Sequence, residues 1–378
     1  MVDRMEAVVC PDFGEWSVQE VPRPEPAADE ALIAVRRVQL SVTECQRFYG
    51  EEVSGRETIH EQMQEGDGRP FGHEFSGEIV ETGPDVDALD VGDRVYAPAK
   101  VPCGECPYCR TGHRGLCDNL TSIGKGRPGA LAEYLAAPVE ALRRVPDGVS
   151  DAEAAAMQPL ASAILCVHDA RVELDDTVAV FGTGVMGAHA GQLSLVRGAG
   201  EVYAVDVVPE KLEFAAERGM EPVDAREVDP VAAIDDATDG IGADVVFASV
   251  GGNQSRLTSG DDPVAHAYDM VRTDGKLVQV GLLQGEMALS PRNVRGKEVD
   301  WIHPRHGVRS FGPNSDTGEL AGKLVADGRV DIARYVDREV EGLESFEKAV
   351  EMTANKPEYD ALGPTQIVVD RPSRPESR

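Results

Sequence analysis

Long apolar runs are missing from the sequence. No segment approaches the roughly twenty apolar residues that a bilayer-spanning helix requires, and the start, MVDRMEAVVCPDF, lacks the apolar core and small-residue cleavage site of a secretory leader. We therefore expect a cytoplasmic protein without a membrane partner. The hydrophobic share of 42% suits a globular chain, and 378 residues exceed the usual size of a single core. Two domains are the natural prediction.

Basic residues, lysine above all, are also scarce. The 67 Asp and Glu against 37 Lys and Arg give a formal net charge of -30, and the acids are spread along the whole chain. Such a field repels phosphate backbones, so we expect no nucleic-acid partner. Widely distributed carboxylates with few lysines resemble proteins of halophilic organisms, in which concentrated salt screens the self-repulsion. An acidic docking surface is the alternative interpretation.

The pattern of apolar residues changes twice along the chain. Residues 1–155 contain short apolar runs such as ALIAVRRV and SGEIVETG, separated by Gly, Pro and Asp, which predict an all-β style of domain. Residues 156–303 alternate strand, glycine turn and helix, as in TVAVFGTGVMGAHAGQLSLV, which predicts a parallel α/β domain. Residues 304–378 contain two predicted helices and a last strand, TQIVVD. No internal repeat is present.

A glycine fingerprint opens the predicted α/β domain. In VAVFGTGVMG, three glycines lie directly after an apolar strand-like run and before a helical stretch, which is the context that dinucleotide binding requires. Gly182 permits the tight turn, Gly184 lets a pyrophosphate approach the backbone, and Gly187 lets the helix pack closely on the strand. The start of the helix, with Val185 and Met186, offers unpaired N–H groups to phosphate.

The residues after the fingerprint predict which dinucleotide binds. Asp206 ends the next apolar run, VYAVD. Its carboxylate can accept hydrogen bonds from the adenine-ribose hydroxyls and would repel a 2′-phosphate, so NAD is favoured over NADP. Lys211, one helical turn further, can also reach the ribose, and Val250 and Gly281 complete the predicted cofactor contacts. The alternative is an α/β protein whose glycine turn and strand-end aspartate bind no nucleotide.

Four cysteines lie close together in CGECPYCRTGHRGLC. Cys103, Cys106, Cys109 and Cys117 have the spacing C-x2-C-x2-C-x7-C, which lets thiolates of one short loop converge on zinc at about 2.3 Å with no open coordination position. A closed set of four sulfur ligands predicts a structural zinc. Disulfides, which a reducing cytoplasm disfavours, an iron–sulfur cluster and four unliganded thiols are the alternatives.

The order of these motifs is itself informative. FGHEFSGEIVETG, VGDRV, the cysteine loop, FGTGVMG and LVQVGL resemble the zinc-containing medium-chain dehydrogenases/reductases along nearly the whole chain, and MQPLASA resembles the E-P-L-A of their polyol, threonine and sugar dehydrogenase branch. The resemblance implies a GroES-like catalytic domain, formed by residues 1–155 and 304–378, with an inserted Rossmann doubly wound parallel sheet. It also implies a homo-oligomer, dimer or tetramer, and a small-molecule substrate held with the nicotinamide in a cleft.

The catalytic metal site of that family is only partly matched. The resemblance assigns its ligands to a Cys, to the His and Glu of G-H-E, and to the Glu of E-P-L-A. Here His73 and Glu74 match, but Ser41 and Gln158 stand at the other two positions. Because two anionic ligands have become neutral, zinc affinity should fall. Three interpretations stay open: a weakened zinc site of His73, Glu74 and Ser41 or Gln158 with water, rescue by Cys45, and no catalytic metal.

Two further features concern the chemistry. Thr43 matches the family's Ser/Thr proton-relay position, whereas Gln46 stands at the relay-histidine position of some relatives and cannot take up a proton as imidazole can. In WIHPRHGVR, Arg305 and His306 belong to a concentration of His and Arg that could bind a carboxylate or polyhydroxylated substrate, or supply an acid/base group. A salt-bridge cluster at a subunit interface is the alternative for this segment.

The leading hypothesis is an NAD-dependent oxidoreductase that transfers hydride between nicotinamide and a secondary alcohol or ketone of a polyol, sugar or hydroxy acid. One alternative is a metal-free reductase or lyase on the same scaffold. Another is a non-catalytic, NAD-binding regulatory protein that kept the cysteine loop. The zinc content separates them, since about two ions per chain favour the dehydrogenase and about one favours either alternative.

Overall fold

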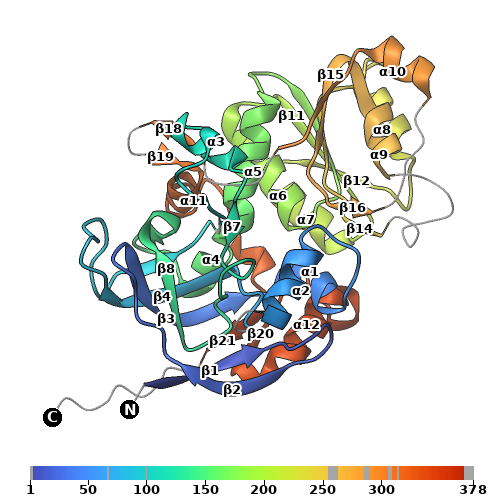
Figure 1. Cartoon of the computed structure of the whole chain (residues 1–378). Coiled ribbons are helices and arrows are strands. Elements are labelled where there is room, and N and C mark those ends of the chain that lie inside the picture. Colours follow the sequence, from blue (N-terminus) through green and yellow to red (C-terminus); the bar gives the residue numbers. More distant parts are fainter. Residues whose placement is uncertain are drawn as a thin grey trace. The chain divides into compact units, whose positions relative to one another are not determined.

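The computed structural model describes residues 3–65, 68–98, 100–253, 263–284, 290–304, 309–312 and 315–369. The chain forms two compact units, one from Met1–Ala161 together with Gly307–Arg378 and one from Ser162–His306 (Figure 1). The chain therefore leaves the first unit, builds the second and returns. None of the described helices is both long and apolar enough to cross a membrane.

A seven-stranded sheet is the centre of the first unit. Its strands follow the order β20 (Glu339–Glu341), β21 (Gln366–Val368), β3 (Glu30–Gln39), β4 (Glu74–Thr82), β5 (Arg94–Tyr96) and β9 (Arg143–Arg144), with β8 (Tyr134–Pro138) also paired to β3. β21, the last described strand, runs antiparallel to β3, so a late segment of the chain lies beside an early one (Figure 1). A hairpin of β1 (Arg4–Val9) and β2 (Ser17–Pro22) adds to this unit.

Helices interrupt the part of the chain in which the sequence predicted strands and turns. α1 (Val42–Phe48) begins after Ser41, whose Oγ accepts a hydrogen bond from the N–H of Glu44, while the Glu44 carboxylate accepts one from the N–H of Ser41. This reciprocal capping box satisfies two backbone donors at the helix start and overrides the β-like character of the surrounding sequence. α2 (Arg56–Glu65) follows before β4.

The second unit is a parallel α/β sheet with a Rossmann strand order. Its strands follow the order β12 (Glu221–Asp224), β11 (Glu201–Asp206), β10 (Thr177–Phe181), β13 (Ala243–Ala248), β15 (Val271–Gln279) and β17 (Asp300–Ile302). All neighbouring pairs are parallel. The chain starts in the middle of the sheet at β10, builds outward to β12 and then crosses to β13, so a topological switch point lies between β10 and β13, where ligands of such sheets bind. This confirms the predicted fold class.

The remaining elements connect or cover these sheets. The helices are α3 (Pro107–Arg110), α4 (Asp151–Ala155), α5 (Met157–Ala170), α6 (Val185–Arg197), α7 (Pro209–Glu217), α8 (Pro230–Ala237), α9 (Pro263–Met270), α10 (Pro291–Lys297), α11 (Thr317–Ala326) and α12 (Phe346–Ala354). Short 3-10 helices are η1 (Arg114–Leu116), η2 (Val139–Ala141), η4 (Ala333–Tyr335), η5 (Leu343–Ser345) and η6 (Lys356–Tyr359). Three small ladders pair β6 (Lys100–Val101) with β7 (Thr121–Ser122), β14 (Gly252–Asn253) with β16 (Leu283–Gln284), and β18 (Ser310–Gly312) with β19 (Ser315–Asp316).

Candidate functional site

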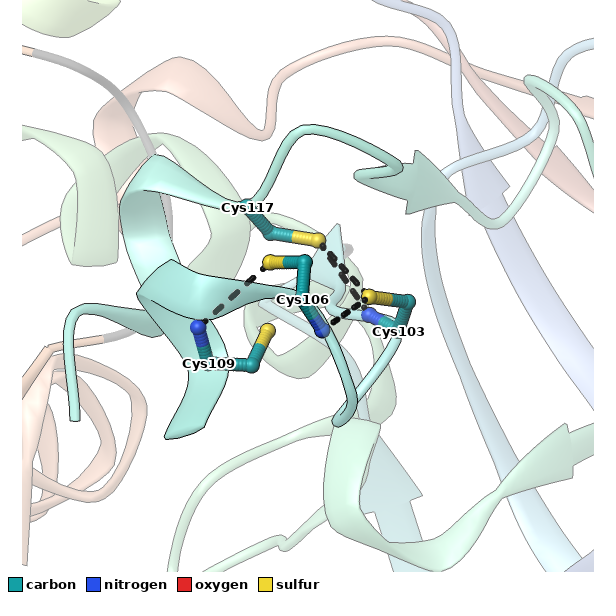
Figure 2. Close-up of side chains that lie close together, drawn as sticks. All are labelled: Cys103, Cys106, Cys109 and Cys117. Atoms are coloured by element: carbon teal, nitrogen blue, oxygen red, sulfur yellow. Dashed lines mark hydrogen bonds between the residues drawn. The ribbon is translucent and has the colours of Figure 1, made fainter. Parts of the chain in front are cut away.

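The four clustered cysteines converge in a small lobe between β6 and β7. Figure 2 shows the sulfur atoms of Cys103, Cys106, Cys109 and Cys117 gathered together, and all lie within 4.8 Å of one another. Backbone donors point at three of them. The N–H of Cys106 lies 3.4 Å from Sγ of Cys103, that of Cys109 lies 3.4 Å from Sγ of Cys106, and that of Cys103 lies 3.3 Å from Sγ of Cys117.

The chemistry of this lobe fits one structural zinc ion. All four cysteines are free of disulfides, and Sγ of Cys103 and Sγ of Cys117 lie 3.5 Å apart, well beyond a disulfide bond of about 2.05 Å. The N–H of Cys109 lowers the pKa of Cys106 to about 6, whereas burial raises the pKa of Cys109 to about 12. Adjacent thiolates repel one another, and a bound dication would compensate their charge.

The glycine fingerprint forms the turn between β10 and α6. Gly182 has φ 93°, in the left-handed region, and a Cβ there would meet the backbone nitrogen of Val250 at 2.9 Å. A Cβ on Gly187 would meet the carbonyl oxygen of Gly182 at 1.9 Å, and one on Gly281 would meet the carbonyl oxygen of Val250 at 2.0 Å. Gly184 is the N-cap of α6, whose first residues are Val185 and Met186. The sheet thus brings together the ends of β10, β13 and β15, as a dinucleotide site needs.

Asp206 lies at the end of β11 and organises this turn. Its Oδ2 accepts hydrogen bonds from the N–H and the hydroxyl of Thr183, at 2.7 and 3.0 Å, and its Oδ1 accepts from the N–H groups of Val207 and Val208, at 2.8 and 3.1 Å. Nζ of Lys211 lies 3.6 Å from Oδ2. The sequence predicted a ribose-binding carboxylate. The structure gives Asp206 an additional role, since it ties the second residue of the glycine turn to the neighbouring strand.

A strained turn precedes the predicted His73 and Glu74 of the first unit. Phe71 has φ 74°, a value that bulky residues rarely adopt, and Gly72 has φ 77°. The carbonyl oxygen of Phe71 lies so close to Gly129 that a Cβ on that glycine would meet it at 1.4 Å. Backbone strain of this kind persists only where the surrounding structure fixes it. The turn at Phe71 and Gly72 leads directly into His73 and β4, and so sets where His73 lies.

The His73 ring lies between two buried carboxylates. Its Nδ1 lies 2.7 Å from Oε1 of Glu44, and its Nε2 lies 3.6 Å from Oε1 of Glu74. Glu44 and Glu74 are each only 3% exposed. Burial opposes the charged form of His73, but the Glu44 and Glu74 carboxylates together outweigh burial and raise the pKa of the ring. Burial likewise disfavours ionised Glu44, but His73 lowers the pKa of that carboxyl. An ion pair in this position orients the imidazole.

Glu74 has a different environment from Glu44. Its Oε2 accepts a hydrogen bond of 2.6 Å from Nε2 of Gln39. Burial raises the pKa of Glu74 to about 7, although His73 and Gln39 act in the opposite direction. The centre therefore combines one ionised carboxylate, one imidazole and one carboxyl group that can gain or lose a proton near neutrality, which are the parts of a proton-transfer site.

Comparison with known proteins agrees with both units. Residues 27–147 match the alcohol dehydrogenase GroES-like domain and residues 185–317 match the zinc-binding dehydrogenase family. The sorbitol dehydrogenase of Halalkalibacterium halodurans is 32% identical over 299 residues, covering 77% of this chain and 81% of that protein. The chain belongs to the zinc-binding dehydrogenase family.

Other members agree over nearly the full length. The D-arabitol-phosphate dehydrogenase of Enterococcus avium is 28% identical, with 90% of this chain and 93% of that protein covered. The alcohol dehydrogenase TADH of Thermus sp. ATN1 is 26% identical with a TM-score of 0.77, covering 97% of this chain and 100% of that structure. This zinc-binding dehydrogenase is accordingly an oxidoreductase that uses a nicotinamide cofactor.

The catalytic zinc of the family does not fit the residues at His73. The hydroxyl of Ser41 caps α1, accepting from Glu44, and a neutral hydroxyl is a poor substitute for a thiolate. Among the residues that the structure describes, the cysteine lobe is the one group of three or more His, Cys, Asp or Glu whose ligand atoms converge for a metal. Cys45 is not part of such a group with His73 and Glu74, and it is 1% exposed in the apolar core that also contains Phe48. Rescue by Cys45 is therefore not supported.

The other predicted site residues lie as follows. Thr43 is half-buried in α1, and Nε2 of Gln46 donates to Glu51 at 3.2 Å. Gln158 lies in α5, and its proximity to His73 stays a prediction. Arg305 and His306 lie outside the described residues.

Sequence reasoning missed two contributors to the centre. Glu44 is the third residue after Ser41, so the pattern Ser-x-x-Glu in SVTE was a capping-box signal that could have revealed both the helix and the buried carboxylate. Gln39 follows an ordinary strand pattern, and its role depends on which residues lie opposite it in the sheet.

Proposed function

We propose that this zinc-binding dehydrogenase interconverts a secondary alcohol and a ketone of a polyol, sugar or hydroxy acid, with NAD preferred over NADP. The observation that carries this proposal is the position of His73 between the buried carboxylates of Glu44 and Glu74, in a chain that also forms the glycine turn for a dinucleotide. The names of the related sorbitol, D-arabitol-phosphate and erythritol/L-threitol dehydrogenases support the substrate class.

The reaction needs a hydride acceptor and a route for a proton. In the oxidative direction, the carbinol C–H bond breaks and its hydride joins C4 of nicotinamide, while the hydroxyl proton leaves to a base. We assign proton transfer to the His73 ring, which in its neutral form donates Nδ1–H to Glu44 and takes up the hydroxyl proton on Nε2. The family resemblance implies that the Thr43 hydroxyl contacts the substrate. Glu44 holds the ring through Nδ1, which leaves Nε2, 3.6 Å from Oε1 of Glu74, for the proton exchange. In the reductive direction, the same group returns the proton.

The preference for NAD rests on the charge at the end of β11. Asp206 presents a carboxylate there, and a 2′-phosphate would add a dianion beside it, which costs electrostatic free energy. Lys211, 3.6 Å from the carboxylate, offsets part of this charge. Asp206→Asn should therefore bring the dissociation constants of NADH and NADPH closer together, by about tenfold.

The proposal is tested with a panel of polyols, sugars and hydroxy acids, with NAD or NADP, in concentrated KCl. We expect NAD reduction with at least one secondary alcohol, and His73→Asn should lower kcat by about 100-fold or more. His60→Asn is the matched control, because His60 lies exposed in α2 near Asp12, and it should change kcat by less than about twofold. Absence of NADH binding, or of turnover with every alcohol, would sink the proposal and favour a reductase, a lyase or a regulatory protein.

We further propose that the acidic surface adapts the protein to concentrated salt, and that the protein is a cytoplasmic homo-oligomer. The net charge of -30 supports the first part, since salt screens carboxylate repulsion. Following the unfolding midpoint against KCl tests it, and a maximum in dilute buffer would count against it. Sedimentation in the same salt tests the dimer or tetramer.

A further inference from the structure

Three buried polar side chains cross the sheet of the first unit side by side. Gln366 of β21 is the register partner of Gln39 of β3, and Gln39 is the register partner of Glu74 of β4. Residues directly opposite each other on neighbouring strands project to the same face, about 4.5–5.5 Å apart at Cβ. These three residues are 0%, 1% and 3% exposed. Because they are shielded from solvent, their polar atoms depend mainly on protein partners.

Hydrogen bonds join the three side chains in one direction. Nε2 of Gln366 donates to the carbonyl oxygen of Ala152 at 2.8 Å and to Oε1 of Gln39 at 3.2 Å. Nε2 of Gln39 then donates to Oε2 of Glu74 at 2.6 Å. A carbonyl oxygen only accepts, so Ala152 of α4 requires the amino group of Gln366. That group in turn requires the oxygen of Gln39, which leaves Gln39 only its amino group for Glu74.

The orientation of the Gln366 side chain leaves one buried oxygen atom without a hydrogen-bond donor in the described part of the chain. Its Oε1 is buried and accepts from no group among the residues that the structure describes. A buried acceptor without a partner destabilises a fold. Turning the amide over would place oxygen against the oxygens of Ala152 and Gln39. The observed orientation is therefore the one that allows the hydrogen bonds from Gln366 to Gln39 and from Gln39 to Glu74.

We propose that Gln39 and Gln366 are positioning residues of the reaction centre, which hold Glu74 through Oε2 so that Oε1 faces Nε2 of His73. This proposal rests on the proposed function, in which His73 transfers the proton. Oε1 of Glu74 lies 3.6 Å from Nε2 of His73. Gln39 acts directly on Glu74, whereas Gln366 acts only through Gln39, because it sets which end of the Gln39 amide points to the carboxylate.

The test replaces each amide by a side chain of similar length that cannot hydrogen-bond. Gln39→Met should lower kcat by about 10- to 100-fold, as misplacement of a reacting group does, while KM for the cofactor stays within about twofold. Gln366→Met should lower kcat less. In the Gln39→Met background, Gln366→Met should change kcat by less than about twofold, because its route of action is already lost.

A glutamine elsewhere in the same unit separates positioning from stability. Gln62 of α2 donates to the carbonyl oxygens of Arg69 and Arg127 and accepts from the N–H of Gly126. Gln62→Met should lower the melting temperature and leave kcat unchanged. If Gln39→Met and Gln366→Met behave like Gln62→Met, the proposal is wrong. Should Gln39→Met not fold, Gln366→Met decides alone, and an unchanged kcat overturns the proposal.

A second readout does not depend on turnover. The chain has eight histidines, and ring nitrogens labelled with 15N can be observed by NMR, with His73 assigned by the signal that His73→Asn removes. The His73 signals should shift in Gln39→Met and Gln366→Met and stay in place in Gln62→Met. If the His73 signals do not move in Gln39→Met or in Gln366→Met, the positioning role is overturned. If the native protein oxidises no alcohol, the proposed function fails, while this measurement still decides about Gln39 and Gln366.

Discussion

The cysteine lobe and the His73 centre belong to the same unit but differ in how their donors are supplied. In the lobe, four thiols come from fifteen consecutive residues, 103–117, and their sulfurs lie within 4.8 Å of one another. In the centre, Glu44 comes from α1, His73 directly precedes β4, and Glu74 begins that strand. Each of the three contacts oxygen or nitrogen atoms of the protein. The lobe has the sulfur ligands that a zinc ion requires, whereas the centre satisfies its own charges.

The four cysteines of the lobe fit a zinc ion, whereas the residues at the centre do not fit a second one. Thiolates bind zinc strongly, and the zinc ion compensates their negative charge. At the centre, the neutral hydroxyl of Ser41 stabilises a helix start, and the Glu44 carboxylate contacts Nδ1 of His73. The retained lobe is therefore no guide to the metal content of the reaction centre.

The largest expected effect comes from breaking the lobe. Cys106→Ser together with Cys109→Ser removes two of four sulfur ligands, so bound zinc should fall from about one ion per chain to none, and the melting temperature should fall by roughly 10 °C. Zinc analysis after dialysis and thermal unfolding measure these changes. Cys166→Ala, at a buried cysteine outside the lobe, is the control and should keep its zinc. An unchanged zinc content in the double variant would show that these cysteines do not hold the ion.

A smaller effect should follow from removing the charge beside His73. Glu44→Gln keeps the shape of the side chain but takes away the carboxylate that orients Nδ1, so kcat should fall by about 10- to 100-fold, as for other partners that orient a reacting histidine. Steady-state kinetics in concentrated KCl provide the measurement. Glu57→Gln, in the first turn of α2, is the control. A kcat within twofold of the native value would contradict a role for Glu44 at the centre.

The variant expected to disturb the structure least places the family's ligand types at positions 41 and 158. Ser41→Cys together with Gln158→Glu should raise bound zinc from about one to about two ions per chain, because two neutral groups become anionic. The melting temperature should change by only a few degrees, since both side chains keep nearly the same size. Metal analysis of native and variant protein after identical dialysis is decisive. Two zinc ions in the native protein would show that the centre binds metal with the residues it has.

The sequence predicted what consecutive residues determine. The spacing of the four cysteines and of Gly182, Gly184 and Gly187 is set by the covalent chain, and each motif closes within one loop or turn, so the lobe and the dinucleotide turn could be located in advance. The helix α1 was missed although its signal, Ser41 followed by Glu44, is local. The β-like runs on both sides concealed it.

The arrangement around Glu74 could not have been predicted in this way. Gln366 and Gln39 are far apart in the chain, and they meet because β21 pairs antiparallel with β3 in one particular register, which a shift of one residue would destroy. The sequence by itself determined the family, the zinc lobe and the glycine turn, because covalent spacing fixes them. The tertiary structure alone decided that His73 lies between two carboxylates and that Gln39, itself bonded to Gln366, donates to one of them, because strand register and burial select those neighbours.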